Sequence, residues 1–110
     1  MTAIVMTPGA VPLADWRAIY RGTAVSLDPA SAPAIARSAA AVAAILERDE
    51  AVYGINTGFG KLAQTRIPAD RLAELQRNLV LSHSVGIGDL LPDDVLRLVM
   101  ATKVISLARG

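Results

Sequence analysis

The sequence predicts a mainly α protein, with three long helices and short strands near the N-terminus. Apolar residues recur at helical spacing in segments 31–47, 68–82 and 92–110, which is typical of helices with a buried face. Short apolar segments at 3–7 and 23–27 are bounded by Pro, Gly or Asp, which is typical of strands.

The N-terminal region is expected to form a strand, a short helix and a second strand. Pro8-Gly9 ends the first strand, and residues 13–21 form the helix, with Gly22 directly after its end. The second strand spans 23–27 and turns at Asp28. One helix face is expected to pack in the core through Trp16, Ile19 and Tyr20.

The first long helix is predicted from Ser31 to Glu47, with Ser31 as its N-cap. Its apolar residues fall at spacings of four, three and four, so they form one stripe along the helix. The stripe consists of Ile35, Ala39, Val42 and Leu46.

The second long helix begins near Pro68 and Asp70 and ends at about Ser82. Its apolar stripe of Leu72, Leu75 and Leu79 continues to His83, the only histidine. A histidine at such a position is either a core or interface residue or an imidazole that faces a pocket. Both interpretations remain open from the residues alone.

The third long helix follows Pro92 and is apolar on almost every side. Such a helix belongs in the interior of something larger than one small domain. Hydrophobic residues make up 53% of the chain and charged residues 19%, so the apolar surface exceeds what 110 residues can bury alone. We therefore expect a homo-oligomer, or a segment of a larger protein.

Composition excludes several classes of function. The 11 basic and 10 acidic residues form no basic stripe, so we expect no nucleic-acid partner. No run of 18 apolar residues and no signal peptide is present, so we expect no membrane partner and a cytoplasmic location. The absence of cysteine and the single histidine argue against a metal site.

The most distinctive stretch is Tyr53-Gly54-Ile55-Asn56-Thr57-Gly58-Phe59-Gly60, called the glycine loop below. It is either a tight surface turn with Tyr53 and Phe59 packed into the core, or a loop that approaches a ligand with a phenolic hydroxyl at its mouth. A nucleotide-binding P-loop is excluded because Gly60-Lys61 is followed by Leu62 rather than Ser or Thr.

The glycine loop, Leu75-Gln76-Arg77-Asn78-Leu79 and Leu81-Ser82-His83-Ser84-Val85-Gly86 together resemble the aromatic amino acid ammonia-lyases, and most of all the histidine-specific members. The resemblance covers essentially all 110 residues, as the N-terminal part of a large helical-bundle lyase. One departure is Ile105, where the family pattern has Asn before Ser-Leu-Ala.

This resemblance implies that the whole protein eliminates ammonia from L-histidine to give trans-urocanate. It implies an electrophilic methylidene-imidazolone (MIO) prosthetic group, formed from an internal Ala-Ser-Gly, and active sites assembled from several subunits of a homotetramer. Tyr53 matches the catalytic tyrosine, and a phenol with an ordinary pKa of about 10 needs help from charge or hydrogen bonds to act as a base near neutral pH. His83 matches the residue that recognises the substrate imidazole, and the Ser82-His83 pair favours histidine as substrate. The remaining matches are Gly60, a further substrate-binding residue, and Gly54, Asn56 and Gly58, which shape the loop.

No Ala-Ser-Gly occurs in the chain, where the nearest tripeptide is Ala30-Ser31-Ala32. We therefore expect residues 1–110 to be a single N-terminal domain or fragment that holds part of a lyase site, lacks the prosthetic group and is inactive alone. Two alternatives remain. The chain is a truncated paralogue that binds a ligand or regulates a full-length lyase, or it is the N-terminal part of a tyrosine or phenylalanine ammonia-lyase or aminomutase.

Overall fold

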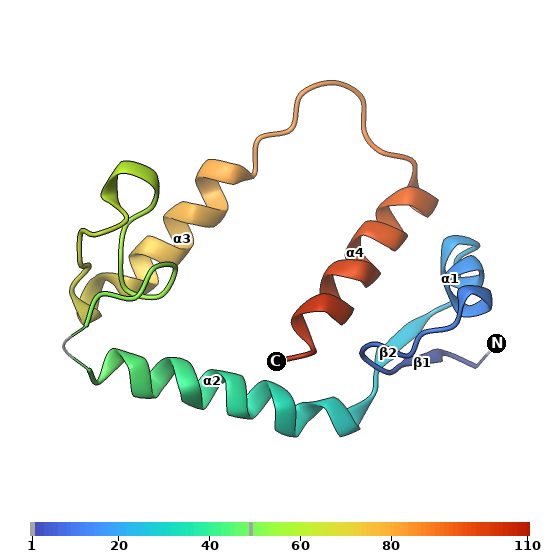
Figure 1. Ribbon diagram of the computed structural model, residues 1–110. Helices are drawn as coiled ribbons and strands as arrows, with labels where there is room; N and C mark the ends of the chain where they lie inside the picture. Colours follow the sequence, from blue (N-terminus) through green and yellow to red (C-terminus); the bar gives the residue numbers. More distant parts are fainter. Residues whose placement is uncertain (1, 49) are drawn as a thin grey trace. The chain divides into compact units, whose positions relative to one another are not determined.

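The computed structural model describes residues 2–48 and 50–110 and is mainly α (Figure 1). The described α-helices and strands, in chain order, are β1 (Ile4–Met6), α1 (Leu13–Tyr20), β2 (Val25–Leu27), α2 (Ala32–Leu46), α3 (Leu72–His83) and α4 (Asp93–Leu107). Short 3-10 turns precede α2 and α3, and a third lies at Gly60–Leu62. The predicted fold class of long helices with short N-terminal strands is confirmed.

The chain divides into two compact units. One unit contains residues up to Ala39 together with Asp89–Gly110, and the other contains Ala40–Gly88. Helix α2 begins in the first unit and ends in the second. All the residues that the glycine loop and the Ser-His pair contribute lie in the second unit.

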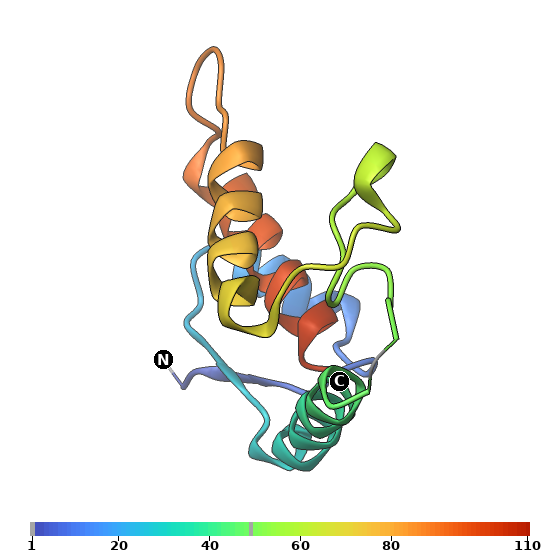
Figure 2. The same cartoon turned by 90° about the vertical axis from the view of Figure 1, so that its left-hand side faces the viewer.

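The first unit is a β-α-β arrangement covered by α4. Strands β1 and β2 pair in parallel, with Ile4 opposite Val25, and α1 connects them. Helices α1 and α4 lie side by side in both views (Figures 1 and 2). Their contact is filled by the buried residues Met6, Ile19 and Ala101, with Ile4, Val11, Trp16, Leu98 and Ile105 packed around them.

Tyr20 differs from the prediction that it packs in the core. Its side chain is 41% exposed, because the hydroxyl lies against the carboxylate of Asp94 at the start of α4. Asp94 raises the pKa of Tyr20 through this hydrogen bond and its charge. In return, the hydrogen bond from Tyr20 lowers the pKa of Asp94.

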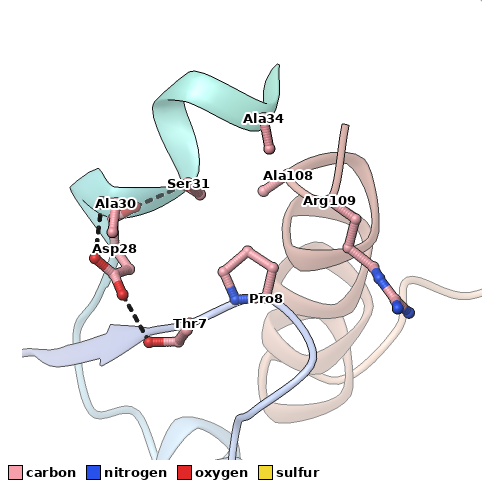
Figure 3. A pocket seen from close by; sticks show the side chains of 8 residues that line it. All are labelled: Thr7, Pro8, Asp28, Ala30, Ser31, Ala34, Ala108 and Arg109. Carbon is pink, nitrogen blue, oxygen red and sulfur yellow. Dashed lines mark hydrogen bonds between the residues drawn. The ribbon is translucent and has the colours of Figure 1, made fainter. Parts of the chain in front are cut away.

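The start of α2 is fixed by Asp28, not by the predicted N-cap Ser31 (Figure 3). The Asp28 carboxylate accepts hydrogen bonds from Ala30 N at 2.9 Å and from the Thr7 hydroxyl at 2.8 Å. The hydroxyl of Ser31 instead donates to the Asp28 carbonyl at 2.6 Å. A short 3-10 turn at Pro29–Ser31 separates this cap from the helix. The capping residue is therefore Asp28, three residues before the predicted N-cap Ser31.

Helix α2 buries no residue completely. Its predicted stripe stays largely on the surface, with Ile35 and Val42 about two-fifths exposed and only Leu46 half-buried at its end. By length and composition, Pro29–Leu46 is apolar enough to cross a membrane, and a core helix of a soluble bundle meets the same criterion. The helix therefore offers an apolar face that the described residues do not cover.

Helix α3 begins later than its sequence signals suggest. Pro68 and Asp70 lead into a 3-10 turn at Ala69–Arg71, and the α-helix begins at Leu72. An Arg71–Glu74 ion pair at 3.0 Å spans its first turn. The predicted stripe of Leu72, Leu75 and Leu79 is half-buried, whereas His83 at its end is exposed.

Candidate functional site

The glycine loop opens with a tight turn that presents Tyr53. Val52 O accepts hydrogen bonds from Ile55 N at 3.1 Å and Asn56 N at 3.2 Å. Gly54 has φ of +81°, the value expected at the third position of a type II turn, where a side chain is strained. The turn reverses the chain directly beneath Tyr53 and so holds its side chain outward.

Asn56 holds this turn closed from inside. Its side chain is 2% exposed. Its Oδ1 accepts a hydrogen bond from Val52 N at 2.7 Å, and its Nδ2 donates to Glu50 O at 2.9 Å. A buried amide with both ends satisfied fixes the backbone that it bridges, so Asn56 ties the turn to Glu50 and Val52.

The second half of the loop pairs with the segment before α3. Ile67 N donates to Asn56 O at 2.8 Å, Gly58 N donates to Thr65 O at 3.0 Å, and Thr57 forms an antiparallel bridge with Arg66. The 3-10 turn at Gly60–Leu62, where Gly60 has φ of +57°, forms the tip.

Gly58 is required for a steric reason. A Cβ at this position would lie 2.6 Å from Leu62 Cβ and 2.9 Å from Leu62 O, closer than atoms pack. Without a side chain, the backbone at Gly58 can pass against the tip of the loop.

Tyr53 is on the surface, so the interpretation in which Tyr53 and Phe59 plug the core is wrong for this chain. The Tyr53 side chain is 62% exposed, and its ring meets that of Phe59 edge to face, with centroids 5.5 Å apart and planes at 64°. Such a pair restricts the ring without engaging the hydroxyl. No hydrogen bond to the Tyr53 hydroxyl occurs among the described residues, so this group is available for proton transfer to a ligand.

A cavity of about 350 Å³ lies under the opening turn of the loop. It is mostly apolar, with Gln76 of α3 as its polar side chain. Its other lining residues are Val42, Leu46, Gly54, Ile55, Leu72 and Ala73. The loop therefore rests on α3 and the end of α2 only in part, which leaves room for further packing beneath Gly54.

Ser82 and His83 are exposed in the last turn of α3 and bond locally. His83 Nδ1 lies 2.8 Å from the Leu79 carbonyl oxygen and 3.1 Å from Ser82 Oγ. The Ser82 hydroxyl donates to the same carbonyl at 3.1 Å. His83 is therefore not buried in a core of this chain, and the interpretations as an interface residue and as a pocket-facing imidazole both stay predictions.

The structure assembles the glycine loop but does not join it to the Ser-His pair. Gly54 and Asn56 form the turn at Tyr53, and Gly58 and Gly60 shape the second half of the loop. Within the described residues, no hydrogen bond or ring contact links Tyr53 to Ser82 or His83, and in both views the tip of the loop stands apart from the C-terminal end of α3 (Figures 1 and 2). The chain thus carries two groups of candidate residues on two separate supports.

Sequence reasoning missed two contributors to these supports. Thr57 is buried, and its hydroxyl donates to Gly58 O at 2.9 Å. The carbonyl of Leu79 holds both Ser82 and His83. Leu79 lies four residues before His83, and residues four apart share one helix face. This spacing is the sequence signal that could have identified Leu79 as a partner of His83.

Comparison with known proteins places the chain in a family. The sequence profile described as aromatic amino acid lyase matches residues 11–110. The histidine ammonia-lyase of Paracidovorax citrulli (strain AAC00-1) is 58% identical over 111 aligned residues, which cover 100% of this chain and 22% of that protein. The chain therefore spans about a fifth of the length of this curated relative.

Two solved structures share the fold. The tyrosine aminomutase of Streptomyces globisporus superimposes with a TM-score of 0.87 at 26% identity, over 99% of this chain and 21% of that one. The Pantoea agglomerans phenylalanine aminomutase gives a TM-score of 0.85 at 24% identity, over 98% of this chain and 21% of that one. Because the family profile covers nearly the whole sequence, this chain belongs to the aromatic amino acid lyase family.

Proposed function

We propose that this chain is the N-terminal segment of a histidine ammonia-lyase, which eliminates ammonia from L-histidine to give trans-urocanate. The observation that carries this proposal is the 58% identity to a histidine ammonia-lyase along the whole chain. The Ser82-His83 pair at the end of α3 supports the choice of histidine over other aromatic amino acids, because an exposed imidazole can pair with a substrate imidazole through hydrogen bonds.

Tyr53 is the proposed catalytic residue. In an elimination, a base takes a proton from the β-carbon, the double bond forms between the α- and β-carbons, and the amino group leaves and is protonated. An exposed hydroxyl on a braced ring suits the proton-transfer step, because the side chain can reach a substrate and keep a constant position. Gly60, Ser82 and His83 are the proposed substrate-binding residues.

The proposed prosthetic group is MIO, which when bound supplies an electrophile that helps the amino group to leave. The chain contains no Ala-Ser-Gly, so its own residues would face this group rather than form it. The accessible hydroxyl of Tyr53 and the accessible imidazole of His83 fit that task, since neither is enclosed within the chain. We further propose that the whole protein is a cytoplasmic homotetramer in which other segments complete each site.

The activity of the whole protein tests the proposal. We expect the complete protein that carries this segment to convert L-histidine to urocanate, measured by ultraviolet absorbance, and to process tyrosine and phenylalanine far more slowly. Replacing His83 by Leu should raise the KM for L-histidine about tenfold or more. A wild-type preference for tyrosine or phenylalanine would instead support the aminomutase or other ammonia-lyase alternative.

The 110-residue chain alone should form no urocanate. Urocanate production by the purified chain, without any added protein, would show that the segment needs no other part of a lyase. A dose-dependent change in the activity of a full-length lyase on mixing would favour the truncated regulatory paralogue.

A further inference from the structure

Three polar atoms converge in the last turn of α3. They are the Leu79 carbonyl oxygen, the Ser82 hydroxyl and His83 Nδ1, and their mutual distances are 2.8 to 3.1 Å. The donor and acceptor roles within this cluster decide which ring nitrogen of His83 carries a proton.

The shortest contact fixes that proton. A carbonyl oxygen only accepts hydrogen bonds, and Leu79 O lies 2.8 Å from His83 Nδ1. Two lone pairs at this separation would repel, so Nδ1 must be the donor. The Ser82 hydroxyl donates to the same carbonyl, which leaves the lone pairs of Ser82 Oγ facing the Nδ1 hydrogen.

We propose that Leu79 O and the Ser82 hydroxyl hold the neutral His83 ring with its proton on Nδ1, so that Nε2 is an acceptor that selects ligands bearing a ring N–H. A neutral imidazole carries one ring hydrogen, so a proton on Nδ1 leaves Nε2 with a free lone pair. The imidazole of L-histidine offers such an N–H, and this identification of the ligand rests on the proposed function. Ser82 is then a positioning residue that acts through His83.

The tautomer can be measured without any substrate. In the complete protein labelled with 15N-histidine, the ring nitrogen signals of His83 are identified as the pair that His83→Leu removes. NMR correlation of these nitrogens with the carbon-bound hydrogens of the neutral ring should show a protonated Nδ1 and an unprotonated Nε2. Predominance of the opposite tautomer, or an averaged mixture of both, would overturn the proposal.

Ser84 provides a matched control for Ser82. Its hydroxyl also donates to a backbone carbonyl of α3, Val80 O, and it makes no hydrogen bond to His83 within the described residues. Ser82→Ala should shift the ring nitrogen signals toward a mixture of tautomers, whereas Ser84→Ala should leave them unchanged. Equal effects of the two substitutions would show that Ser82 does not position the ring.

Ligand preference tests the consequence in the complete protein. Two inhibitors of L-histidine turnover are compared. In 3-(pyrrol-3-yl)alanine the ring has an N–H and no acceptor nitrogen, and in 3-(thiazol-5-yl)alanine the same ring position carries an acceptor nitrogen and no N–H. The thiazole compound should bind about tenfold more weakly, because it would place two acceptors against each other. Ser82→Ala should reduce this ratio, and Ser84→Ala should preserve it.

The outcomes separate the two proposals. If L-histidine is turned over but the thiazole compound binds as tightly as the pyrrole compound, the acceptor role of His83 is wrong and the proposed function stands. If the complete protein does not turn over L-histidine, the proposed function is wrong, and the tautomer measurement still decides the state of His83.

Discussion

At the scale of single residues, the ring and the hydroxyl of Tyr53 have different surroundings in the glycine loop. The ring packs edge to face on Phe59, and the hydroxyl has no partner among the described residues. The ring contact therefore sets position, and the hydroxyl is left for chemistry. A substitution that removes only the oxygen should separate activity from stability.

Tyr53→Phe in the complete protein should lower kcat for L-histidine by about a hundredfold or more, because positioned acid-base groups contribute on that order. The melting temperature should stay unchanged, since the ring contact with Phe59 is kept. Steady-state kinetics and calorimetry check both parts. Tyr20→Phe is the matched control, because Tyr20 lies in the other unit beside Asp94. A similar loss of kcat in both variants would contradict a catalytic role of Tyr53.

Gly58→Ala should destabilise the glycine loop by about 1 to 3 kcal/mol, because the new Cβ would overlap Leu62. Gly86→Ala is the control, since a Cβ there meets nothing within 4 Å. Hydrogen exchange of the Gly58 and Ile67 amides reports the loss, because both donate across the loop. Unchanged exchange rates at these amides in Gly58→Ala would show that the loop adapts without strain.

At the scale of elements, the sequence predicted the helices well because each has a local pattern. The stripe of Leu72, Leu75 and Leu79 follows α-helical periodicity and is the half-buried face of α3. The pairing of residues 56–58 with 65–67 was not predictable in this way. It is made by backbone groups and by the burial of Asn56 and Thr57, and neither leaves a periodic signal.

The cap of α2 shows a similar limit. A Ser directly before an apolar repeat favours an N-cap at Ser31. The structure uses Asp28 instead, because the 3-10 turn at Pro29–Ser31 brings Ala30 N to its carboxylate. A serine and an upstream aspartate compete for this role, and the local sequence alone did not decide between them.

Asp28→Asn should lower the melting temperature of the chain in a pH-dependent way. The hydrogen bonds from Ala30 N and Thr7 lower the pKa of Asp28, so the folded chain binds its proton less readily than the unfolded chain. The ionised Asp28 carboxylate therefore stabilises the folded chain. This stabilisation is fully present above the ordinary aspartate pKa of about 3.9, and it is lost as the pH falls through the lower pKa that Asp28 has in the folded chain.

Thermal unfolding of both proteins between about pH 7 and pH 2 checks this expectation. The gap in melting temperature between wild type and Asp28→Asn should narrow as the pH falls through that window. Asp89→Asn, in the connection before α4, is the control for the loss of a surface carboxylate. A gap that stays constant down to the lowest pH would show that the charge of Asp28 is not involved.

At the scale of the whole molecule, the chain leaves more apolar surface open than a self-contained domain does. Helix α4 packs on α1 through Leu98, Ala101 and Ile105. Its other sides are exposed at Val95, Leu96, Val99, Met100, Val104 and Leu107. The sequence predicted this surplus from composition, because a helix that is apolar on every side has more faces than one neighbour can cover.

The candidate site shows the same incompleteness. The sequence identified Tyr53 and His83 from motif resemblance, and the structure gives each a defined local support. It does not bring them into contact, because the glycine loop and the last turn of α3 are separate within this chain. The chain spans 22% of the length of its curated relative, and the proposed function assigns the remaining groups of the site to other segments.

If the open face of α4 is a packing surface, the isolated chain should associate through it. Val99 is 50% exposed on that face, and burying such a side chain contributes about 1.5 kcal/mol or more. Val99→Lys should therefore weaken association about tenfold or more, as measured by sedimentation equilibrium over a range of concentrations. Lys103→Glu changes a charge at an exposed position of the same helix and should have a smaller effect. A wild-type chain that stays monomeric at every concentration, or equal effects of both substitutions, would mean that this face does not drive assembly of the chain.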